Sequence, residues 1–232
     1  MPERERIAME NSESFEKEKI TCPKCKKENY FAVWHNVNVG ENPELKEQVL
    51  SGSLFQYKCP DCGAVTTVDY GMLYHDPDKK IMIQRVQSAE EMQVVEGVFS
   101  SFLAEENAEQ AGRYAGYTLR VVDSVNRLRE KVYLKELSYD DRAIELMKIY
   151  VYKHLTEENE GIRIEEILLE IKEGKPTDFA IRLEGGQWGS AYFSEEFYKE
   201  VEKEFFGDAQ KTASKDCIVD FVWAAEFLKK NR

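Results

Sequence analysis

Four cysteines in two pairs constrain this chain more than any other feature. Cys22 and Cys25 lie in the run TCPKCK, and Cys59 and Cys62 lie in KCPDCG, with 33 residues (26–58) between the pairs. Two thiolates spaced by two residues can bind one edge of a metal tetrahedron, and a second pair completes a four-sulfur site. We therefore expect Cys22, Cys25, Cys59 and Cys62 to bind one structural zinc ion.

Such a site is closed. Four protein sulfurs leave no open coordination position, so the metal stabilises a fold and does not activate water. Tetrahedral four-sulfur geometry also fits iron, and CPDCG is similar to a rubredoxin-type knuckle, which gives an iron electron-transfer protein as an alternative. Zinc is favoured because Lys26 stands where a rubredoxin-like knuckle would have glycine, and because the excursion between the pairs is long and contains a helix signal.

The chain has 232 residues, more than a typical domain of about 100–200 residues, so two domains are expected. We predict an N-terminal arm at 1–19, a metal-binding domain at 20–124 and a C-terminal α+β domain at 125–232. No apolar run approaches the roughly 20 residues of a membrane span, and the N-terminus has no apolar segment of a signal peptide. We expect no membrane partner and a cytoplasmic location, where paired cysteines more often bind metals than form disulfides.

The expected fold class is α+β, with an elaborated zinc ribbon of antiparallel strands followed by a helix pair and a small antiparallel sheet with helices. In the first domain, ENPELKEQVLSGS predicts a short helix with Asn42 as N-cap and Gly52 just past its end. Alternating patterns predict strands at 30–39, 54–58, 65–75, 80–86 and 117–122, and near-helical spacing predicts a helical insertion at 89–112.

The C-terminal domain begins with a predicted helix pair at 123–156, whose second helix starts at Ser138, with Asp141 completing a capping box. Residues 157–232 are expected to form a meander and closing helices. The alternation in RIEEILLEI changes phase near Glu165 and Glu166, which predicts a β-bulge. Ser194 is expected to cap a helix that stops at Gly207, in the same 157–232 segment.

The charge and motifs limit the possible functions. A net charge of −12 weighs against a general nucleic-acid binder, because nonspecific affinity comes mostly from basic side chains. A nucleic-acid-binding zinc ribbon is kept as an alternative, because lysines stand beside aromatic residues around the first pair: Lys24, Lys26, Lys27, Tyr30, Phe31 and Trp34.

No catalytic residue is proposed, because HExxH, GxSxG, P-loop and dinucleotide patterns do not occur and His35, His75 and His154 lack ligand spacing. These histidines are expected in a strand, at a turn and late in a helix, and Cys217 is expected to be a small core residue. The leading hypothesis is a noncatalytic protein-interaction or regulatory module, with a protein as its partner.

Three runs together resemble the CpXC family, a zinc-ribbon-like group of bacterial and archaeal proteins without assigned function. They are TCPKC, then FAVWHNVNVGENPELKEQVLSGSLFQYKCPDCG, then MLYHDPDKKIMI. The likeness covers about residues 20–124. It implies that Cys22, Cys25, Cys59 and Cys62 are the metal ligands, and it implies no activity.

Overall fold

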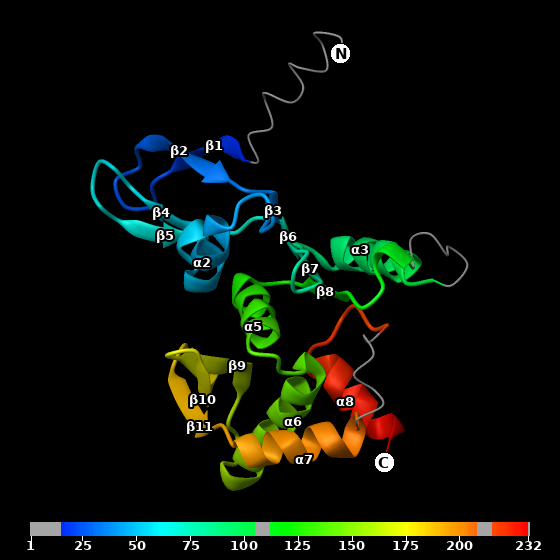
Figure 1. Cartoon of the computed structure of the whole chain (residues 1–232). Helices are drawn as coiled ribbons and strands as arrows, with labels where there is room; N and C mark the ends of the chain where they lie inside the picture. The colour runs from blue at the N-terminus through cyan, green and yellow to red at the C-terminus, as the bar shows by residue number, and fades with distance from the viewer. Residues whose placement is uncertain (1–14, 105–111, 208–214, 232) are drawn as a thin grey trace.

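The computed structural model describes residues 15–104, 112–207 and 215–231, which form a mixed α/β protein. Figure 1 shows the two hairpins that carry the cysteine pairs (the knuckle hairpins, β1–β2 and β4–β5) at one end, a central sheet with helices, and a second sheet with helices at the other end. The strands are β1 (Glu16–Thr21), β2 (Glu28–Val33), β3 (Asn36–Asn38), β4 (Gln56–Lys58), β5 (Val65–Thr67), β6 (Met72–Asp76), β7 (Ile81–Arg85), β8 (Thr118–Val122), β9 (Ile164–Lys172), β10 (Lys175–Leu183) and β11 (Trp188–Tyr192). The helices are α2 (Glu44–Ser51), η1 (Ser53–Phe55), α3 (Ala89–Phe102), α5 (Val125–Glu136), α6 (Asp141–Glu158), α7 (Glu195–Phe205) and α8 (Phe221–Lys230).

Each cysteine pair lies at the turn of a two-stranded antiparallel hairpin. β1 pairs with β2 around the first pair, and β4 pairs with β5 around the second. Residues 1–14 of the expected arm lie outside the described residues, whereas residues 16–19 belong to β1. The sequence pattern missed this strand because β1 is mostly exposed and charged.

The central sheet differs from the predicted antiparallel ribbon. Its order is β3-β6-β7-β8; only β6 and β7 are antiparallel, whereas β3 runs parallel to β6 and β7 runs parallel to β8. Parallel neighbours need a long crossover connection, usually one that contains a helix. The segment with α2 provides one crossover, and α3 provides the other. The strand expected at 30–39 is accordingly broken at Trp34 and His35, and its halves join different sheets.

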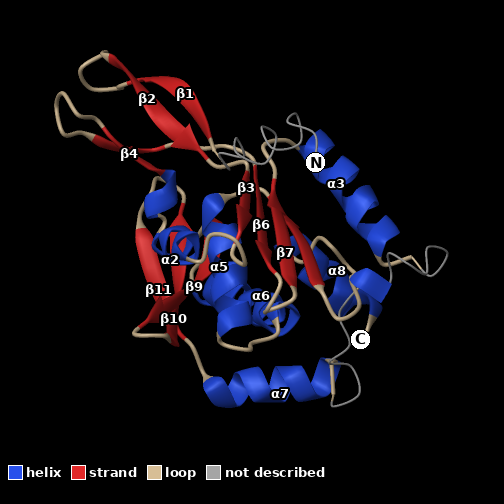
Figure 2. Cartoon of the chain, turned by 45° about the horizontal axis from the view of Figure 1, so that its top comes forward, coloured by secondary structure: helices blue, strands red, loops and turns tan. Residues whose placement is uncertain are grey.

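Helices cover both faces of the central sheet (Figure 2). One face packs with α2 and α5 in a core that includes Phe55, Met72, Tyr74, Ile83 and Leu128. The other face packs with α3 in a smaller core around Phe99 and Leu119. The insertion expected at 89–112 is therefore helical as far as Phe102, and residues 105–111 lie outside the described part of the chain.

The second sheet is the predicted antiparallel meander, with order β11-β10-β9. The register moves from Arg182 opposite Glu166 to Leu183 opposite Ile164, so Glu165 is the extra residue of a bulge, as predicted. One face of this sheet packs against α6, α7 and α8 in the largest core, which includes Phe179, Ile181 and Met147.

The helix boundaries test the capping predictions. Gly52 ends α2 with a left-handed φ of 78°, and the Ser194 hydroxyl accepts a hydrogen bond from the backbone N–H of Phe197 at the start of α7, both as predicted. Asn42 is not the N-cap of α2, because Pro43 occupies that position. Ser138 is not a cap either.

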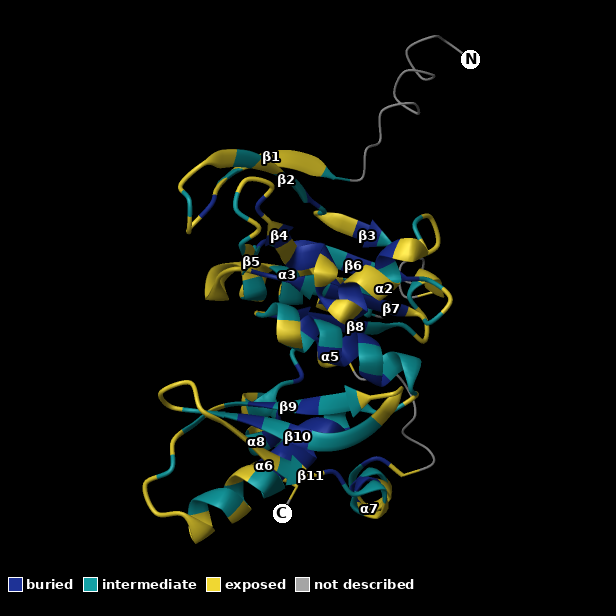
Figure 3. Ribbon diagram, turned by 90° about the vertical axis from the view of Figure 1, so that its left-hand side faces the viewer, coloured by how far each residue is buried: buried dark blue, intermediate teal, exposed yellow. Residues whose placement is uncertain are grey.

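Ser138 instead has a φ of 62° in the turn before α6, and the Asp140 carboxylate caps that helix by accepting from the Arg142 N–H. Figure 3 shows how burial is distributed: the β1–β2 hairpin is largely exposed, while buried residues gather in the central sheet and in α5. Among the described helices, none has the length and apolar character that crossing a membrane requires.

Candidate metal centre

The two cysteine pairs are held by backbone turns of the same design. In the first, the Cys22 N–H donates to the Lys27 carbonyl, and the Lys26 N–H donates to the Cys22 carbonyl. In the second, the Cys59 N–H donates to the Ala64 carbonyl, and the Gly63 N–H donates to the Cys59 carbonyl. The fourth residue after the first cysteine has a positive φ in both turns, 63° at Lys26 and 69° at Gly63.

These turns bring the four predicted ligands together. The Sγ atoms of Cys22 and Cys62 are 3.7 Å apart, as are those of Cys25 and Cys59, and all four sulfurs lie within 4.8 Å of one another. A tetrahedron with metal–sulfur bonds of about 2.3 Å has edges of about 3.8 Å. The sulfurs are too far apart for disulfides, which need about 2.05 Å, and all four cysteines are free thiols. The cluster is therefore positioned to bind a tetrahedral metal ion.

Backbone groups favour thiolates in this cluster. Hydrogen bonds from the N–H groups of Cys25 and Lys24 lower the pKa of Cys22. Burial opposes ionisation of Cys59, but N–H groups of Cys62 and Asp61 outweigh it and lower the pKa of Cys59 to about 6. Metal ligands must be deprotonated, so these N–H groups prepare the sulfurs for a cation.

The last thiols to ionise experience the opposite effect. The Lys27 N–H lowers the pKa of Cys25, but burial and the neighbouring thiols Cys22, Cys62 and Cys59 raise it overall to about 12. Four negative sulfurs this close repel one another, and a divalent cation would remove that repulsion. A bound divalent cation would therefore stabilise the fully ionised cluster.

One ion pair joins the two knuckles outside the sulfurs. Lys27, two residues after Cys25, donates to the carboxylate of Asp61, which lies inside the second pair, and the Asn29 amide donates to the same carboxylate at 3.2 Å. The hydrogen bond from Lys27 lowers the pKa of Asp61, and Asp61 raises the pKa of Lys27. Both side chains are partly exposed, so the contact orients the knuckles more than it stabilises them.

The histidines are not part of this cluster. His35 lies in the bend between β2 and β3 and His75 lies in β6, so their expected positions in a strand and at a turn were wrong, whereas His154 lies late in α6 as predicted. His75 Nε2 is 3.2 Å from the Tyr117 hydroxyl, and burial lowers the pKa of His75. His35, Glu16 and Glu18 form a second group of potential ligands, but all three are exposed.

The fifth cysteine is also separate from the cluster. Cys217 is buried in the core behind α3, as predicted, and burial raises the pKa of its thiol.

Sequence reasoning missed a buried network of six charged side chains where β8, α5 and α6 meet. Its members, three basic and three acidic, are Arg120, Glu130, Lys131, Asp141, Glu145 and Lys148. On a helix these residue types normally face solvent, so the sequence carried no signal that they are inside.

The network is completely paired. Asp141 accepts two bonds from Arg120, at 2.7 and 2.8 Å, and Lys131 lies between Asp141 and Glu145 at 3.1 and 3.0 Å. Lys148 pairs with Glu145 at 3.0 Å and with a second acid at 2.7 Å. Burial opposes the ionisation of Asp141, but its two cationic partners hold the pKa of that carboxyl well below its usual range.

The second carboxylate that pairs with Lys148 is that of Glu130. Glu130 also accepts a hydrogen bond from the backbone N–H of Leu169. Arg120 donates to the carbonyl oxygen of Asp216 as well. The network thus links the central sheet to β9 and to the segment before α8.

The family comparison gives a match over more than half of the chain. A family model described as CpXC protein matches residues 20–148 of the 232-residue chain. The match confirms the resemblance and extends it beyond residue 124. Comparisons with curated proteins and with solved structures found no match.

Proposed function

The chain belongs to the CpXC protein family, and we propose that it is a zinc-stabilised, noncatalytic module that binds another protein. The observation that carries the metal assignment is the spacing of the four sulfurs, which matches the edges of a tetrahedron at 3.7 Å in two places. With four protein ligands, the site is closed to substrate. The metal therefore has a structural role.

Zinc is proposed over iron for two reasons. Lys26 adopts a left-handed conformation at the position where Gly63 stands in the second knuckle, which departs from an iron knuckle. The excursion between the cysteine pairs also contains β3, α2 and η1, unlike a compact iron-binding fold. A reducing compartment keeps thiols available for metal, so we place the protein in the cytoplasm.

A protein partner is supported by the outer edge of the second sheet. β11 pairs only with β10 among the described strands, and it exposes Trp188 (57%) and Tyr192 (78%) on one face. Trp188 also lines a groove of about 380 Å³ between α5 and the sheet, together with Tyr133 and Leu168. Exposed aromatic side chains are enriched at protein interfaces, and an open strand edge can pair with an extended segment of a partner.

Nucleic acid is the second candidate, with one observation behind it. Tyr30 is 69% exposed and shares the outer face of the β1–β2 hairpin with Lys17 and Lys19. However, Lys19 is paired with Glu28 at 2.6 Å. Lysines neutralised by neighbours contribute little to phosphate binding, so this candidate ranks below a protein partner.

Elemental analysis tests the metal assignment. We expect about one zinc ion per chain in freshly purified protein, and a loss of zinc in Cys59→Ser. Cys217→Ser is the matched control, because this cysteine is buried away from the cluster. Iron in place of zinc, or equal zinc in Cys59→Ser and wild type, would contradict the proposal.

A comparative pull-down from native lysate tests the partner. A protein retained by wild type should be lost with Trp188→Ser and kept with Val65→Ser, an equally exposed apolar residue on β5. Equal capture by both variants would refute the assigned surface. A single-strand DNA or RNA shift that is abolished by Tyr30→Ser would favour the second candidate.

A further inference from the structure

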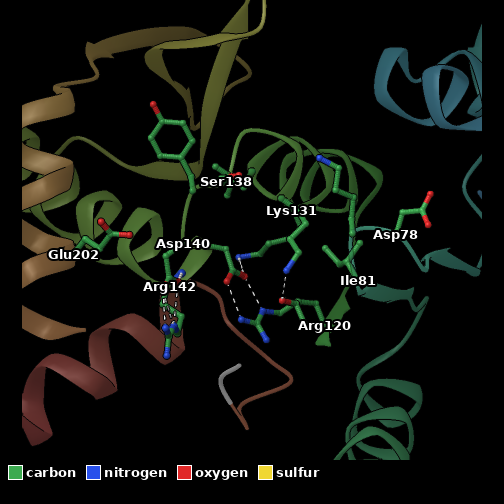
Figure 4. A pocket seen from close by; sticks show the side chains of 14 residues that line it. Asp78, Ile81, Arg120, Lys131, Ser138, Asp140, Arg142 and Glu202 are labelled. Carbon is green, nitrogen blue, oxygen red and sulfur yellow. Dashed lines mark hydrogen bonds and ion pairs between the residues drawn. The ribbon is translucent and has the colours of Figure 1, made fainter. Parts of the chain in front are cut away.

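A cavity of about 490 Å³ lies where the central sheet meets α5 and α6 (Figure 4). It is lined by the turn before β7, the start of β8, the end of α5 and the beginning of α6, with Glu202 of α7 at one side. Small-molecule sites typically measure about 300–1,000 Å³. The cavity is therefore large enough for a metabolite-sized ligand.

The lining is rich in cationic side chains, although the chain as a whole carries a net charge of −12. The basic residues at the cavity are Lys79, Arg120, Lys131, Lys135 and Arg142, and the acidic ones are Asp78, Asp140, Asp141 and Glu202. Figure 4 shows Asp78 on the opposite side from Asp140 and Arg142. Cations thus outnumber acids at this one cavity.

Four of the five cations have a carboxylate partner. Arg120 and Lys131 bind Asp141, as described for the buried network. Arg142 binds Asp140 at 2.6 Å, and Lys79 lies 3.4 Å from Glu136.

Lys135 is different. Among the described residues no carboxylate lies within ion-pair distance of its Nζ, which donates to the Thr118 hydroxyl at 2.9 Å. An ammonium group has three donors, so two remain for a ligand. Burial lowers the pKa of Lys135; the more distant charges of Asp141 and Asp140 oppose this shift, and those of Arg120 and Lys79 add to it.

The position of Lys135 in the helix supplies only part of what the charge needs. Lys135 lies in the last turn of α5, where the carbonyl end of a helix attracts a cation. That attraction is worth a fraction of an ion pair and accepts no hydrogen bond from the two remaining donors. The cavity therefore has unused donors for one more anion.

We propose that this cavity binds a small molecule through a carboxylate or phosphate group that accepts hydrogen bonds from Lys135 Nζ. Ser138 is on the same lining and carries a hydroxyl that can donate, while Ile81 and Leu134 provide apolar wall for the rest of the ligand. This site is independent of the metal cluster and of the proposed protein surface.

Protection of Lys135 from chemical labelling tests the proposal. The full-length protein is treated with a limiting amount of an amine-reactive succinimidyl ester, in sodium phosphate or sodium acetate at constant ionic strength, and acylation is read by mass spectrometry. At ten times the half-saturating anion concentration, labelling of Lys135 should slow about tenfold. Lys172, which pairs with Glu170 at 3.1 Å on β9, is the internal control and should be unaffected.

The two anions distinguish the ligand classes. Protection by phosphate alone assigns a phosphate group, protection by acetate alone assigns a carboxylate, and protection by both supports the shared chemistry. No saturable protection of Lys135 up to tens of millimolar of either anion would overturn the proposal, as would equal protection of Lys172.

Variants give a second measurement. The rise in melting temperature caused by the active anion should disappear in Lys135→Met and persist in Lys135→Arg and in Lys172→Met. The same rise in Lys135→Met and wild type would overturn the proposal. If Lys135→Met does not fold, the labelling of wild type and the response of Lys135→Arg decide the question.

Discussion

Removal of the metal should loosen the two knuckle hairpins and leave the rest of the protein folded. The buried core around the sulfurs is small, with only Cys22, Tyr57 and Cys59 fully inside it. The central sheet has a larger core that includes Phe55, Met72 and Leu128, and it shares only Phe31 and Val68 at its border with the core around the sulfurs, among the described residues. We therefore expect the hairpins to depend on the metal and the central sheet to stay folded without it.

The size of the effect follows from loop closure. A metal that joins Cys22 to Cys62 closes a loop of 40 residues. The chain-entropy relation for a cross-link of that length gives about 4 kcal/mol at 25 °C. Since 1.4 kcal/mol is a factor of ten, the knuckle amides should lose about a thousandfold of their protection against hydrogen exchange.

Hydrogen exchange with and without a chelator measures this loss. The informative amides are those of Lys26 and Gly63, which donate to the carbonyls of Cys22 and Cys59. The amide of Val86, which donates to the Val122 carbonyl in the central sheet, is the internal reference and should exchange at an unchanged rate. Unchanged protection at Lys26 and Gly63 would refute the structural role of the metal, and an equal loss at Val86 would refute the independence of the central sheet.

Three further perturbations have defined outcomes. Lys26→Gly should stabilise the metal-bound protein by about 1 kcal/mol, because a left-handed conformation costs a residue with a side chain about 1–2 kcal/mol. Gly63→Ala should destabilise the protein by a similar amount for the same reason. Thermal melts measure both changes, and changes of the opposite sign would contradict this explanation. Glu145→Gln should lower the free energy of unfolding by about 3–5 kcal/mol, because Lys131 and Lys148 lose a buried partner. The control Glu165→Gln, at the exposed pair with Arg182, should lower it by under about 1 kcal/mol. Urea unfolding measures both variants, and equal losses would contradict the role of burial. Burial opposes ionisation of Glu145, but Lys131 and Lys148 lower its pKa in the folded state, so the advantage of wild type over Glu145→Gln should be complete above the unfolded pKa of about 4.3 and should shrink as the pH falls through the lower folded pKa. A difference that already shrinks between pH 7 and pH 5 would show that this carboxylate is not held ionised by its partners.

The features that were predicted correctly depend on neighbours in the sequence. The two cysteines of each pair are brought together by one short turn, and the end of α2 at Gly52 follows from one left-handed residue. The cap at Ser194 and the bulge at Glu165 also depend on a few consecutive residues. Such local features can be predicted from the sequence because they do not depend on tertiary contacts.

The features that were missed depend on distant pairing. The three residues of β3 are too few to show that their partner is β6, and that it runs parallel to them. The break at Trp34 is invisible in an alternation that continues through it. The buried charges of α5 and α6 could not be predicted, because nothing local shows that Lys131 will lie beside Asp141 and Glu145 inside the protein.

The buried network explains why the part of the chain that matches the family model (residues 20–148, here the family unit) extends past residue 124. Arg120 is 2% exposed, and its carboxylate partner Asp141 lies in the first turn of α6. A unit that stopped at residue 124 would leave this guanidinium buried without its counter-ion, which typically costs about 3–5 kcal/mol.

The other members of the network complete the argument. Glu145 and Lys148 follow on the same helix, and residue 148 is also where the family match ends. Beside these charged residues, α6 places Ile144, Leu146 and Met147 in the core of the second sheet. The charged residues in the first half of α6 therefore pair with the family unit, and the apolar residues of the same segment pack against the second sheet. A CpXC chain that lacks the second sheet would need another cover for those apolar positions.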